Sequence, residues 1–305
     1  MGKPRIAFVG SGGATKGLAH LGVLMAMEEL DLRPDIFVGA STGAIVGAFV
    51  SQGLGSEEMI DWFRPFWRRR DAKPLKARHF LGLPNGEQLR QPGYLTSGVF
   101  SMDRVERFLA SRLPCNDFRM LERPLFVTAA DIDGRGRAVF GRGYREDVPI
   151  SQALAASSCI PVLFRPYRIG DRYYVDGELV RTLSADLAVG AGAEIIIVSN
   201  VYHPTVTRPP RRSIARKGAV QVGRQAFDIL LNEKSRRSME LMQRLHPHVT
   251  LLDVAPSLGR YSFTSRRHAE RIVQLGYREG FSVLAAAKRR GLFEVAANVR
   301  TVGEA

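Results

Sequence analysis

Ser41 lies in a pentapeptide whose residue types and spacing suit a nucleophile. The segment GASTG (residues 39–43) stands directly between a short apolar run and an apolar stretch with helical spacing. In a strained strand-to-helix turn, glycines flank the serine because a side chain at either position would clash, and the turn lifts the hydroxyl above the sheet. Gly39 and Gly43 therefore predict a nucleophile elbow with Ser41 as the nucleophile.

A second turn, rich in glycine, precedes this elbow. The segment FVGSGGATKGLAH (residues 8–20) also connects an apolar run to a helical pattern. A phosphate-binding P-loop must end in Gly-Lys-Ser/Thr, and the order Thr-Lys-Gly at residues 15–17 excludes it. A dinucleotide fingerprint would place Thr15 in its third glycine position, where the side chain is too large for close packing of the helix on the strand. Asp31, however, lies near the position expected for the acid that binds the ribose. A nicotinamide-binding oxidoreductase is therefore an alternative, and it predicts cofactor binding that we do not expect.

In the third interpretation, the turn binds a negative charge that exists only during a reaction. A serine nucleophile needs backbone N–H donors aimed at the oxyanion of its tetrahedral intermediate. A glycine turn that opens a helix would supply such donors at the positive end of the helix dipole. We therefore expect the turn to form an oxyanion hole close to Ser41.

The histidines do not provide an obvious base for the serine. In α/β-hydrolases a histidine follows the serine and the acid in the chain, but that fold has several strands before its elbow, and Ser41 comes too early for it. Among the six histidines, His20 lies in the helix after the glycine turn, and we expect His20 and those in polar contexts each to be structural or solvent-facing. Those in polar, surface-like contexts are His203, His246, His248 and His268.

Asp176 is a better candidate for the base. It ends the short apolar run in YYVDG and precedes Gly177, which places it at the edge of the sheet where the two turns are expected to meet. Taken alone, the pattern indicates an Asp-Gly turn, and the combination with the elbow favours a catalytic role. A carboxylate of ordinary pKa is a poor base for serine, so we expect partial desolvation to raise the pKa of Asp176.

Strands and helices alternate along much of the chain. This alternation implies parallel strands with right-handed crossovers and functional loops at their carboxyl ends. The segment 56–113 is less regular and could cover a site. With no internal repeat and no clean linker, we expect a single domain over residues 1–305. The expected strands are 5–9, 35–38, 123–132, 137–140, 172–175 and 194–199, and the expected helices are 17–30, 42–52, 57–67, 102–112, 150–157, 184–189, 220–245 and 265–289, with an apolar run at 249–254.

The formal net charge of +14 favours an anionic partner. Basic residues gather at residues 68–70 and 208–217 without the interleaved aromatic side chains on which bases stack, and a solvated basic loop explains these runs equally well. Cys115 and Cys159 are too few for a disulfide framework and are expected to be free, and no Cys/His cluster suggests a metal. The N-terminal segment resembles neither a signal peptide nor a membrane span, so a cytoplasmic location is expected.

Taken together, these segments resemble the bacterial patatin-like phospholipases, which are serine lipid acyl hydrolases with a Ser-Asp dyad. The motifs occur in the family's order: the glycine turn leading into KGLAHLGVL, then GASTGAIVGA, TAADIDGRGRAVF, ALAASSCIPVLF and VDGELV, with a weaker echo in QLGY at residues 274–277. The resemblance extends over residues 5–198. It implies an α/β fold, a three-layer α/β/α sandwich with a mainly parallel central sheet, on which residues 199–305 pack as a basic loop and C-terminal helices.

The resemblance also implies roles for single residues. It implies an acyl ester of a lipid as the substrate, an acyl-Ser41 intermediate, Asp176 as the base within a motif that includes Gly177 and Glu178, and neither metal nor cofactor. We expect a lipid ester and, through the basic residues, the surface of an anionic membrane as partners, and no nucleic acid. The residues of the implied oxyanion hole are Gly12, Gly13, Ala14, Thr15, Lys16 and Gly17.

The chain departs from the family pattern at Ala14, Lys16 and Glu178. Ala14 replaces a third glycine and can offer its N–H if the turn does not require a positive φ there. Lys16 replaces an arginine, which keeps the charge but not the planar fork. Glu178 replaces glycine or alanine, and it either raises the pKa of Asp176 or points to solvent. These departures leave an alternative open, a weakly active or inactive protein with a lipid-binding or regulatory role.

A separate segment is rich in aromatic residues and could contact a membrane. It belongs either to an interfacial helix or to the core. Its residues are Trp62, Phe63, Phe66 and Trp67, beside Arg68, Arg69 and Arg70.

Overall fold

The computed structural model describes residues 3–61, 98, 100–202, 213–259, 261 and 268–294. Its strands are β1 (Ile6–Gly10), β2 (Ile36–Gly39), β3 (Leu125–Asp131), β4 (Gly136–Phe140), β5 (Tyr167–Ile169), β6 (Arg172–Asp176), β7 (Ile195–Ser199) and β8 (Thr250–Val254). Its α-helices are α1 (Ala19–Glu29), α2 (Ser41–Val50), α6 (Asp103–Arg112), α7 (Ile150–Ser157), α8 (Ala185–Gly190), α9 (Ala219–Leu245) and α10 (Ala269–Arg289). Short 3₁₀ helices are η1 (Ala14–Leu18), η2 (Phe118–Met120), η3 (Gly177–Leu179) and η4 (Ile214–Lys217).

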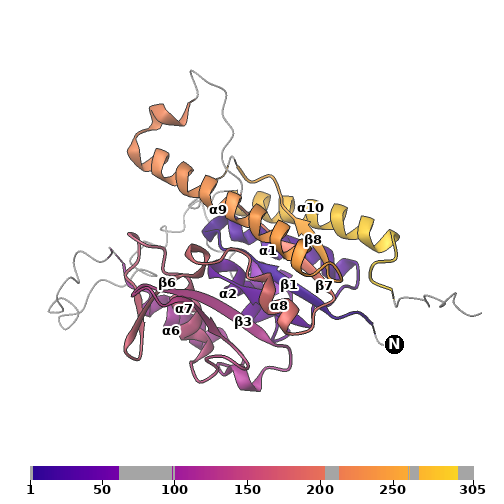
Figure 1. Cartoon of the computed structure of the whole chain (residues 1–305), viewed down its shortest axis with the longest axis horizontal. Helices are drawn as coiled ribbons and strands as arrows, with labels where there is room; N and C mark the ends of the chain where they lie inside the picture. The colour runs from indigo at the N-terminus through magenta and orange to yellow at the C-terminus, as the bar shows by residue number, and fades with distance from the viewer. Residues whose placement is uncertain are drawn as a thin grey trace, which may run out of the picture.

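The strands form one mixed, eight-stranded sheet (Figure 1). Strands β8, β7, β1, β2 and β3 are neighbours in this order and run parallel. Every residue of β1, β2 and β7 is buried, as expected for parallel strands covered by helices on both faces. Strand β3 also pairs antiparallel with β4 and with β6, and β6 pairs antiparallel with β5. The sheet is therefore parallel at its centre and antiparallel where β6 approaches the site.

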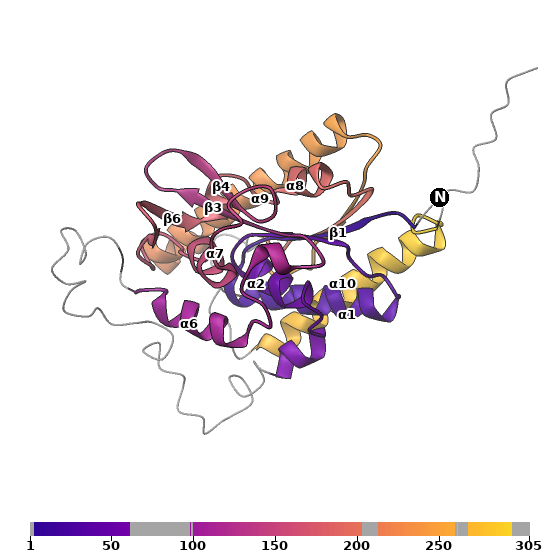
Figure 2. The ribbon, with the colours of Figure 1, turned by 90° about the horizontal axis from the view of Figure 1, so that it is seen from below.

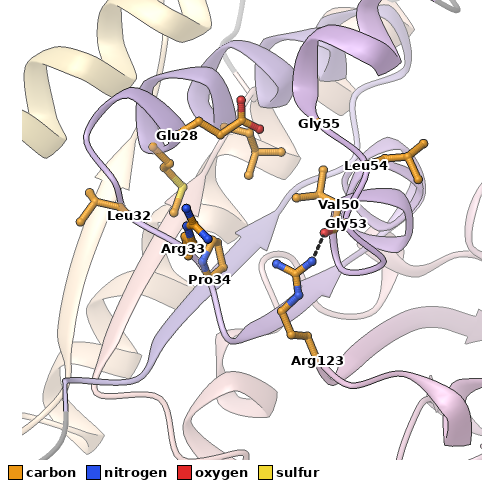
Figure 3. Close-up of a pocket in the computed structure, with 11 residues that line it drawn as sticks. Glu28, Leu32, Arg33, Pro34, Val50, Gly53, Leu54, Gly55 and Arg123 are labelled. Carbon is orange, nitrogen blue, oxygen red and sulfur yellow. Dashed lines mark hydrogen bonds between the residues drawn. The ribbon is translucent and has the colours of Figure 1, made fainter.

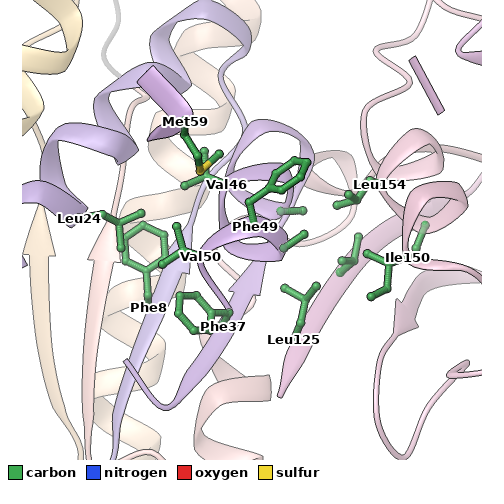
Figure 4. Close-up of a cluster of buried hydrophobic side chains, with 14 of the residues drawn as sticks. Phe8, Leu24, Phe37, Val46, Phe49, Val50, Met59, Leu125, Ile150 and Leu154 are labelled. Atoms are coloured by element: carbon green, nitrogen blue, oxygen red, sulfur yellow. The ribbon is translucent and has the colours of Figure 1, made fainter. Parts of the chain in front are cut away.

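Helices cover both faces of the sheet and give three layers (Figure 2). Helices α8 and α9 lie on one face, and α1, α2, α6, α7 and α10 lie on the other. In the larger core, Phe8, Phe37 and Leu125 of the strands face Val46 and Phe49 of α2 (Figure 4). Each such side chain contributes about 1.5–3 kcal/mol on burial, so α2 is held firmly on the sheet. The expected α/β/α sandwich is confirmed.

The observed elements follow the expected order and differ mainly at their ends. The helix expected over residues 17–30 begins as η1 and continues as α1, and the apolar run 249–254 contributes strand β8. Strand β5 was not predicted, because a strand of three residues is too short to show an alternating pattern. Residues 62–70 and 203–212, which include the expected interfacial aromatic residues, His203 and much of the basic loop, lie outside the described residues.

Helices α1 and α10 pack in direct backbone contact through two glycines. A β-carbon at Gly276 would overlap the carbonyl of Ala19, and one at Gly22 would overlap the carbonyl of Val273. This contact gives the QLGY segment a packing role and attaches the last described helix to the first. That residues 1–305 form a single domain stays a prediction.

Replacing Gly276 with alanine is expected to destabilise the protein by about 1–3 kcal/mol, because the added methyl group meets backbone atoms that cannot move independently. Helix propensity alone predicts the opposite sign, since alanine is favoured over glycine by about 1 kcal/mol within a helix. Gly223 of α9 is the matched control, because nothing lies within 4 Å of a β-carbon placed there. Urea denaturation should show a lower midpoint for Gly276→Ala and a higher one for Gly223→Ala. Equal shifts of both variants would contradict the packing role.

Candidate active site

Ser41 is the first residue of α2, in the turn that follows β2. Its backbone φ is 51°, in the left-handed region that costs an L-residue roughly 1–2 kcal/mol. A β-carbon at Gly39 would lie 2.5 Å from the nitrogen of Ala44, and one at Gly43 would overlap the carbonyl of Gly10. The strand-to-helix turn is therefore as tight as the flanking glycines predicted.

Ser157, at the end of α7, fixes the backbone of this turn. The Ser41 N–H donates to Ser157 Oγ at 2.8 Å, and Ser157 Oγ donates to the carbonyl of Thr128 at 2.7 Å. Ser157 is fully buried, so water cannot replace either bond. This role has no signal in the sequence beyond a small polar residue at the end of an apolar helix. Because the Ser41 N–H is already used, the donors for an oxyanion must come from another segment.

Strand pairing brings Asp176 to Ser41. Strand β2 pairs with residues 125–127 of β3, where Gly39 lies opposite Val127. Strand β6 pairs with residues 129–131 of β3, where Asp176 lies opposite Ala129. Since β4 occupies the other edge of β3 over residues 127–131, β2 and β6 must share one edge. They run in opposite directions, so the carboxyl end of β6 meets the carboxyl end of β2.

The Asp176 carboxyl is buried, with 8% of the residue exposed. Burial raises its pKa to about 6, although hydrogen bonds from the Glu178 N–H and from the Ser41 side chain lower it. The carboxyl remains ionised at neutral pH and is a stronger base than an exposed aspartate. Partial desolvation and contact with the serine are the two properties that a carboxylate base for Ser41 needs.

The glycine turn lies against the elbow. A β-carbon at Gly12 would lie 3.1 Å from Ser41 Cβ, and one at Gly17 would lie 2.5 Å from Thr42 Cβ. Thr42 Oγ1 also donates to the carbonyl of Ala14 at 3.2 Å. Gly13 has a φ of 156°, and a β-carbon there would overlap Val201. These close approaches require glycine and place Gly12 of the turn against Ser41 and Gly17 against Thr42.

Ala14 departs from the expectation. Its φ is 46°, so the turn does adopt the left-handed conformation at this position, and the condition set for alanine is not met. The alanine is accommodated with backbone strain that glycine would not have.

Replacing Ala14 with glycine is therefore expected to stabilise the protein by about 1 kcal/mol, because relief of the strain exceeds the extra entropy of glycine in the unfolded chain. Thermal unfolding measures this directly. The control is Ala215→Gly, at an exposed residue of η4 that is absent from the left-handed residues of the described chain. A lower melting temperature for Ala14→Gly would show that the turn does not store this strain.

Helix α9 holds both turns from the opposite side. Lys16 is 1% exposed, and its Nζ lies 3.5 Å from Asp228 Oδ2 of α9. Lys234 Nζ, also of α9, donates to the carbonyls of Glu178 and Leu179 at 3.1 and 2.7 Å. The sequence did not identify Asp228 or Lys234, because charges in a long helical pattern are usually solvated. Lys16 therefore has an acidic partner inside the protein.

Glu178 is buried rather than solvent-facing. Only 2% of the residue is exposed, and its Oε1 accepts a hydrogen bond from the Gly12 N–H at 2.8 Å. Of the two alternatives left open for Glu178, a side chain that points to solvent is therefore wrong. Burial, followed by the negative charge of Asp176, raises the pKa of Glu178 to about 8. A carboxyl that stays neutral at neutral pH therefore touches the glycine turn.

His20 has the structural role expected for it. Its Nε2 lies 2.8 Å from the carbonyl of Ser11, and its Nδ1 lies 2.7 Å from Ser199 Oγ. A carbonyl can only accept, so Nε2 carries the proton and the hydroxyl of Ser199 donates to Nδ1. Burial lowers the pKa of His20 to about 4, so the ring is neutral. Both cysteines are free, as expected.

A pocket of about 310 Å³ lies at the other end of the sheet. It is lined by residues before and around the amino ends of β2 and β3, including Pro34 and Arg123 (Figure 3). The Arg123 guanidinium donates to the carbonyls of Val50 and Ser51 at 2.6 and 3.0 Å, which caps the end of α2. Arg123 therefore stabilises the end of α2 opposite Ser41. The pocket is separate from the site that contains Ser41.

Two further properties concern only the part of the chain that the structure describes. No group of three or more His, Cys, Asp and Glu side chains there is arranged to hold a metal ion. None of the helices described is both long enough and apolar enough to cross a membrane.

Comparison with known proteins identifies relatives of uncharacterised activity. The chain is 29% identical over 194 residues to an uncharacterised NTE family protein of Mycobacterium tuberculosis, which covers 63% of this chain and 30% of the relative. It is 26% identical over 190 residues to the uncharacterised protein YqhO of Bacillus subtilis, which covers 56% of this chain and 62% of YqhO. The chain therefore spans 30% of the length of the first relative and 62% of the second.

The fold has a match among solved structures. VipD from Legionella pneumophila superposes with a TM-score of 0.50 at 13% identity, over 93% of this chain and 67% of VipD. The model of the patatin-like phospholipase family matches residues 8–189, more than half of the chain. That range contains the elbow, the glycine turn and Asp176, and the chain belongs to the patatin-like phospholipase family.

Proposed function

We propose that this protein is a lipid acyl hydrolase that cleaves a carboxylic ester through an acyl-Ser41 intermediate, with Asp176 as the base and the glycine turn as the oxyanion hole. The observation that carries the proposal is the meeting of a strained serine with a buried carboxyl of raised pKa, beside the N–H groups of a glycine turn. Membership of the patatin-like phospholipase family supports a lipid ester as the substrate.

The reaction follows from these positions. Ser41 Oγ attacks the ester carbonyl carbon while Asp176 accepts its proton, and N–H groups of the glycine turn bind the oxygen that becomes negative. Collapse of the tetrahedral intermediate breaks the bond to the alcohol, which takes the proton from Asp176. Water then attacks the acyl-Ser41 ester, again with Asp176 as the base, and releases the fatty acid.

Hydrolysis of p-nitrophenyl esters of graded chain length tests this function. The proposal expects release of p-nitrophenol by the purified protein, with a preference for medium or long acyl chains. The competing function, a weakly active lipid-binding or regulatory protein, predicts no release above background for any chain length, and that result would replace the hydrolase proposal.

We further propose that the protein contacts an anionic membrane at the edge that contains Asp176. The Asp176 N–H donates to the carbonyl of Cys159 at 2.9 Å, and soon after Cys159 the chain exposes Val162 (85%) and Leu163 (43%). Val180, in the turn after η3, is 40% exposed. Exposed apolar side chains next to a site, on a chain with a net charge of +14, suit an interface with acidic lipid.

Binding to vesicles should therefore increase with their content of phosphatidylserine and weaken with added salt. Val162 and Leu163 are exposed on this face, and replacing both with serine should weaken binding at least about tenfold, since burial of each such side chain contributes about 1.5–3 kcal/mol. Co-sedimentation with phosphatidylcholine vesicles is the neutral control. Binding that depends neither on the content of anionic lipid nor on the salt concentration would rule out the electrostatic contact.

A further inference from the structure

Glu178 connects the two halves of the site. Its backbone N–H donates to Asp176 Oδ1 at 3.1 Å, and its side-chain Oε1 accepts from the Gly12 N–H at 2.8 Å. Within the described residues, Oε2 is buried and has no hydrogen-bond partner. One oxygen of the carboxyl therefore accepts a hydrogen bond from an amide of the glycine turn. The other is buried, and within the described residues no hydrogen bond offsets its loss of contact with water.

This carboxyl also lies close to the serine. A β-carbon placed on Gly12 would be 3.1 Å from Glu178 Cγ and 3.1 Å from Ser41 Cβ. An ester that reacts with Ser41 must bring its carbonyl carbon to about 3–3.5 Å from the hydroxyl oxygen and its carbonyl oxygen onto amide donors. An oxygen already bound to the Gly12 N–H, next to Ser41, competes for the place of that carbonyl oxygen.

We propose that the Glu178 carboxyl is an internal occupant of the oxyanion site, which holds the Gly12 N–H in the free enzyme and releases it to the carbonyl oxygen of the substrate. This inference rests on the proposed hydrolase function. Glycine or alanine, expected at this position from the family resemblance, has no side chain that could reach the amide. Glu178 thus slows a reaction that its neighbours promote, and substrate binding must break its hydrogen bond.

The charges around Glu178 make this occupation dependent on pH. Asp176 faces it from the end of β6, Lys234 from α9 and Tyr202 from the segment after β7, with the Lys16–Asp228 ion pair nearby. Burial and the charge of Asp176 raise the pKa of Glu178 to about 8, against the opposing effect of Lys234. Below that pH a neutral carboxyl accepts from Gly12. Above it a carboxylate forms a charge-assisted bond about twice as strong and opposes a negative oxyanion. The occupation therefore tightens as the pH rises through about 8.

The rate at which a fluorophosphonate labels Ser41 tests the inference without turnover of a lipid. The reaction forms a bond from Ser41 Oγ to phosphorus, passes the serine proton to Asp176 and releases fluoride, and the phosphoryl oxygen needs the same amide donors. Wild type, Glu178→Ala and Glu178→Gln are compared between about pH 6 and 10, the range over which such groups titrate, with Ser41→Ala as the baseline and thermal unfolding as the check on folding. Lys234 also titrates in alkaline solution, and Glu178→Gln separates its effect because it removes only the carboxylate.

Glu178→Ala should react about fivefold faster than wild type at neutral pH, equivalent to one net hydrogen bond of about 1 kcal/mol. Wild-type labelling should decline as the pH rises through about 8, and neither variant should show that decline. An alanine variant no faster than wild type, or a glutamine variant that keeps the decline, would overturn the inference alone. Failure of all three to label above the Ser41→Ala baseline would overturn the proposed function, and this inference with it.

Discussion

Ser41→Ala is expected to lower kcat for ester hydrolysis by at least about 10⁴-fold, since a site without its nucleophile retains only the contribution of binding and oxyanion donors. The variant keeps the β-carbon and the same left-handed backbone, so its fold should be unchanged. Rates on a p-nitrophenyl ester and thermal unfolding measure the two properties on the same sample.

Ser111 provides the control for this substitution. It is an exposed serine of α6, and its hydroxyl donates to the carbonyl of Phe108 within its own helix. Ser111→Ala should keep the wild-type rate. Activity of Ser41→Ala close to that of Ser111→Ala would mean that another residue attacks the ester.

Asp176→Asn is expected to lower kcat by about 10³–10⁴-fold, because an amide cannot accept the serine proton. The amide oxygen can still accept from the Glu178 N–H, so the turn should keep its shape. In wild type, kcat/KM should fall as the pH decreases through about 6, where Asp176 becomes protonated. A profile of kcat/KM against pH measures this limb.

The stability of the folded protein should depend on pH in the direction opposite to kcat/KM. The folded pKa of Asp176, about 6, is above its ordinary value of 3.8, so the folded state binds the proton more tightly than the unfolded chain does. The stability from this group is complete below about pH 4 and is lost as the pH rises to about 6. At pH 7 Asp176→Asn should therefore be more stable than wild type, on the order of 1–3 kcal/mol.

Asp133→Asn is the matched control for Asp176→Asn. Asp133 precedes Gly134 in the turn between β3 and β4, so it has the local pattern that Asp176 would have if it were only a turn residue. Its substitution should leave the rate and the pH profile unchanged. Similar kinetics for the two variants would remove Asp176 from the mechanism.

The parts of the site that depend on local geometry were predictable from the sequence. Gly39 and Gly43 had to be small because the elbow is tight, and Asp176 had to end a strand because carboxyl ends of strands carry the functional loops. The prediction that Asp176 needs desolvation followed from chemistry alone. Each of these inferences uses a residue and its immediate neighbours in the chain.

The contacts made by distant segments were not predictable. Ser157 supports Ser41 across 116 positions in the chain, and Asp228 and Lys234 reach the site from a helix that looked solvated. The φ of Ala14 and the burial of Glu178 depend on how β7 and α9 close over the glycine turn. A single sequence contains no signal for such packing, because the same side chains would be ordinary surface residues in another arrangement.

Detection of the acyl-enzyme tests directly whether Ser41 is the nucleophile. Wild-type protein is mixed with a p-nitrophenyl ester, quenched in acid during turnover, digested and examined by mass spectrometry. We expect the mass of the acyl group on the peptide that contains Ser41, and accumulation of that species when deacylation is slow. An acyl group on another residue, or hydrolysis that proceeds with no acyl group on Ser41, would contradict this role of Ser41.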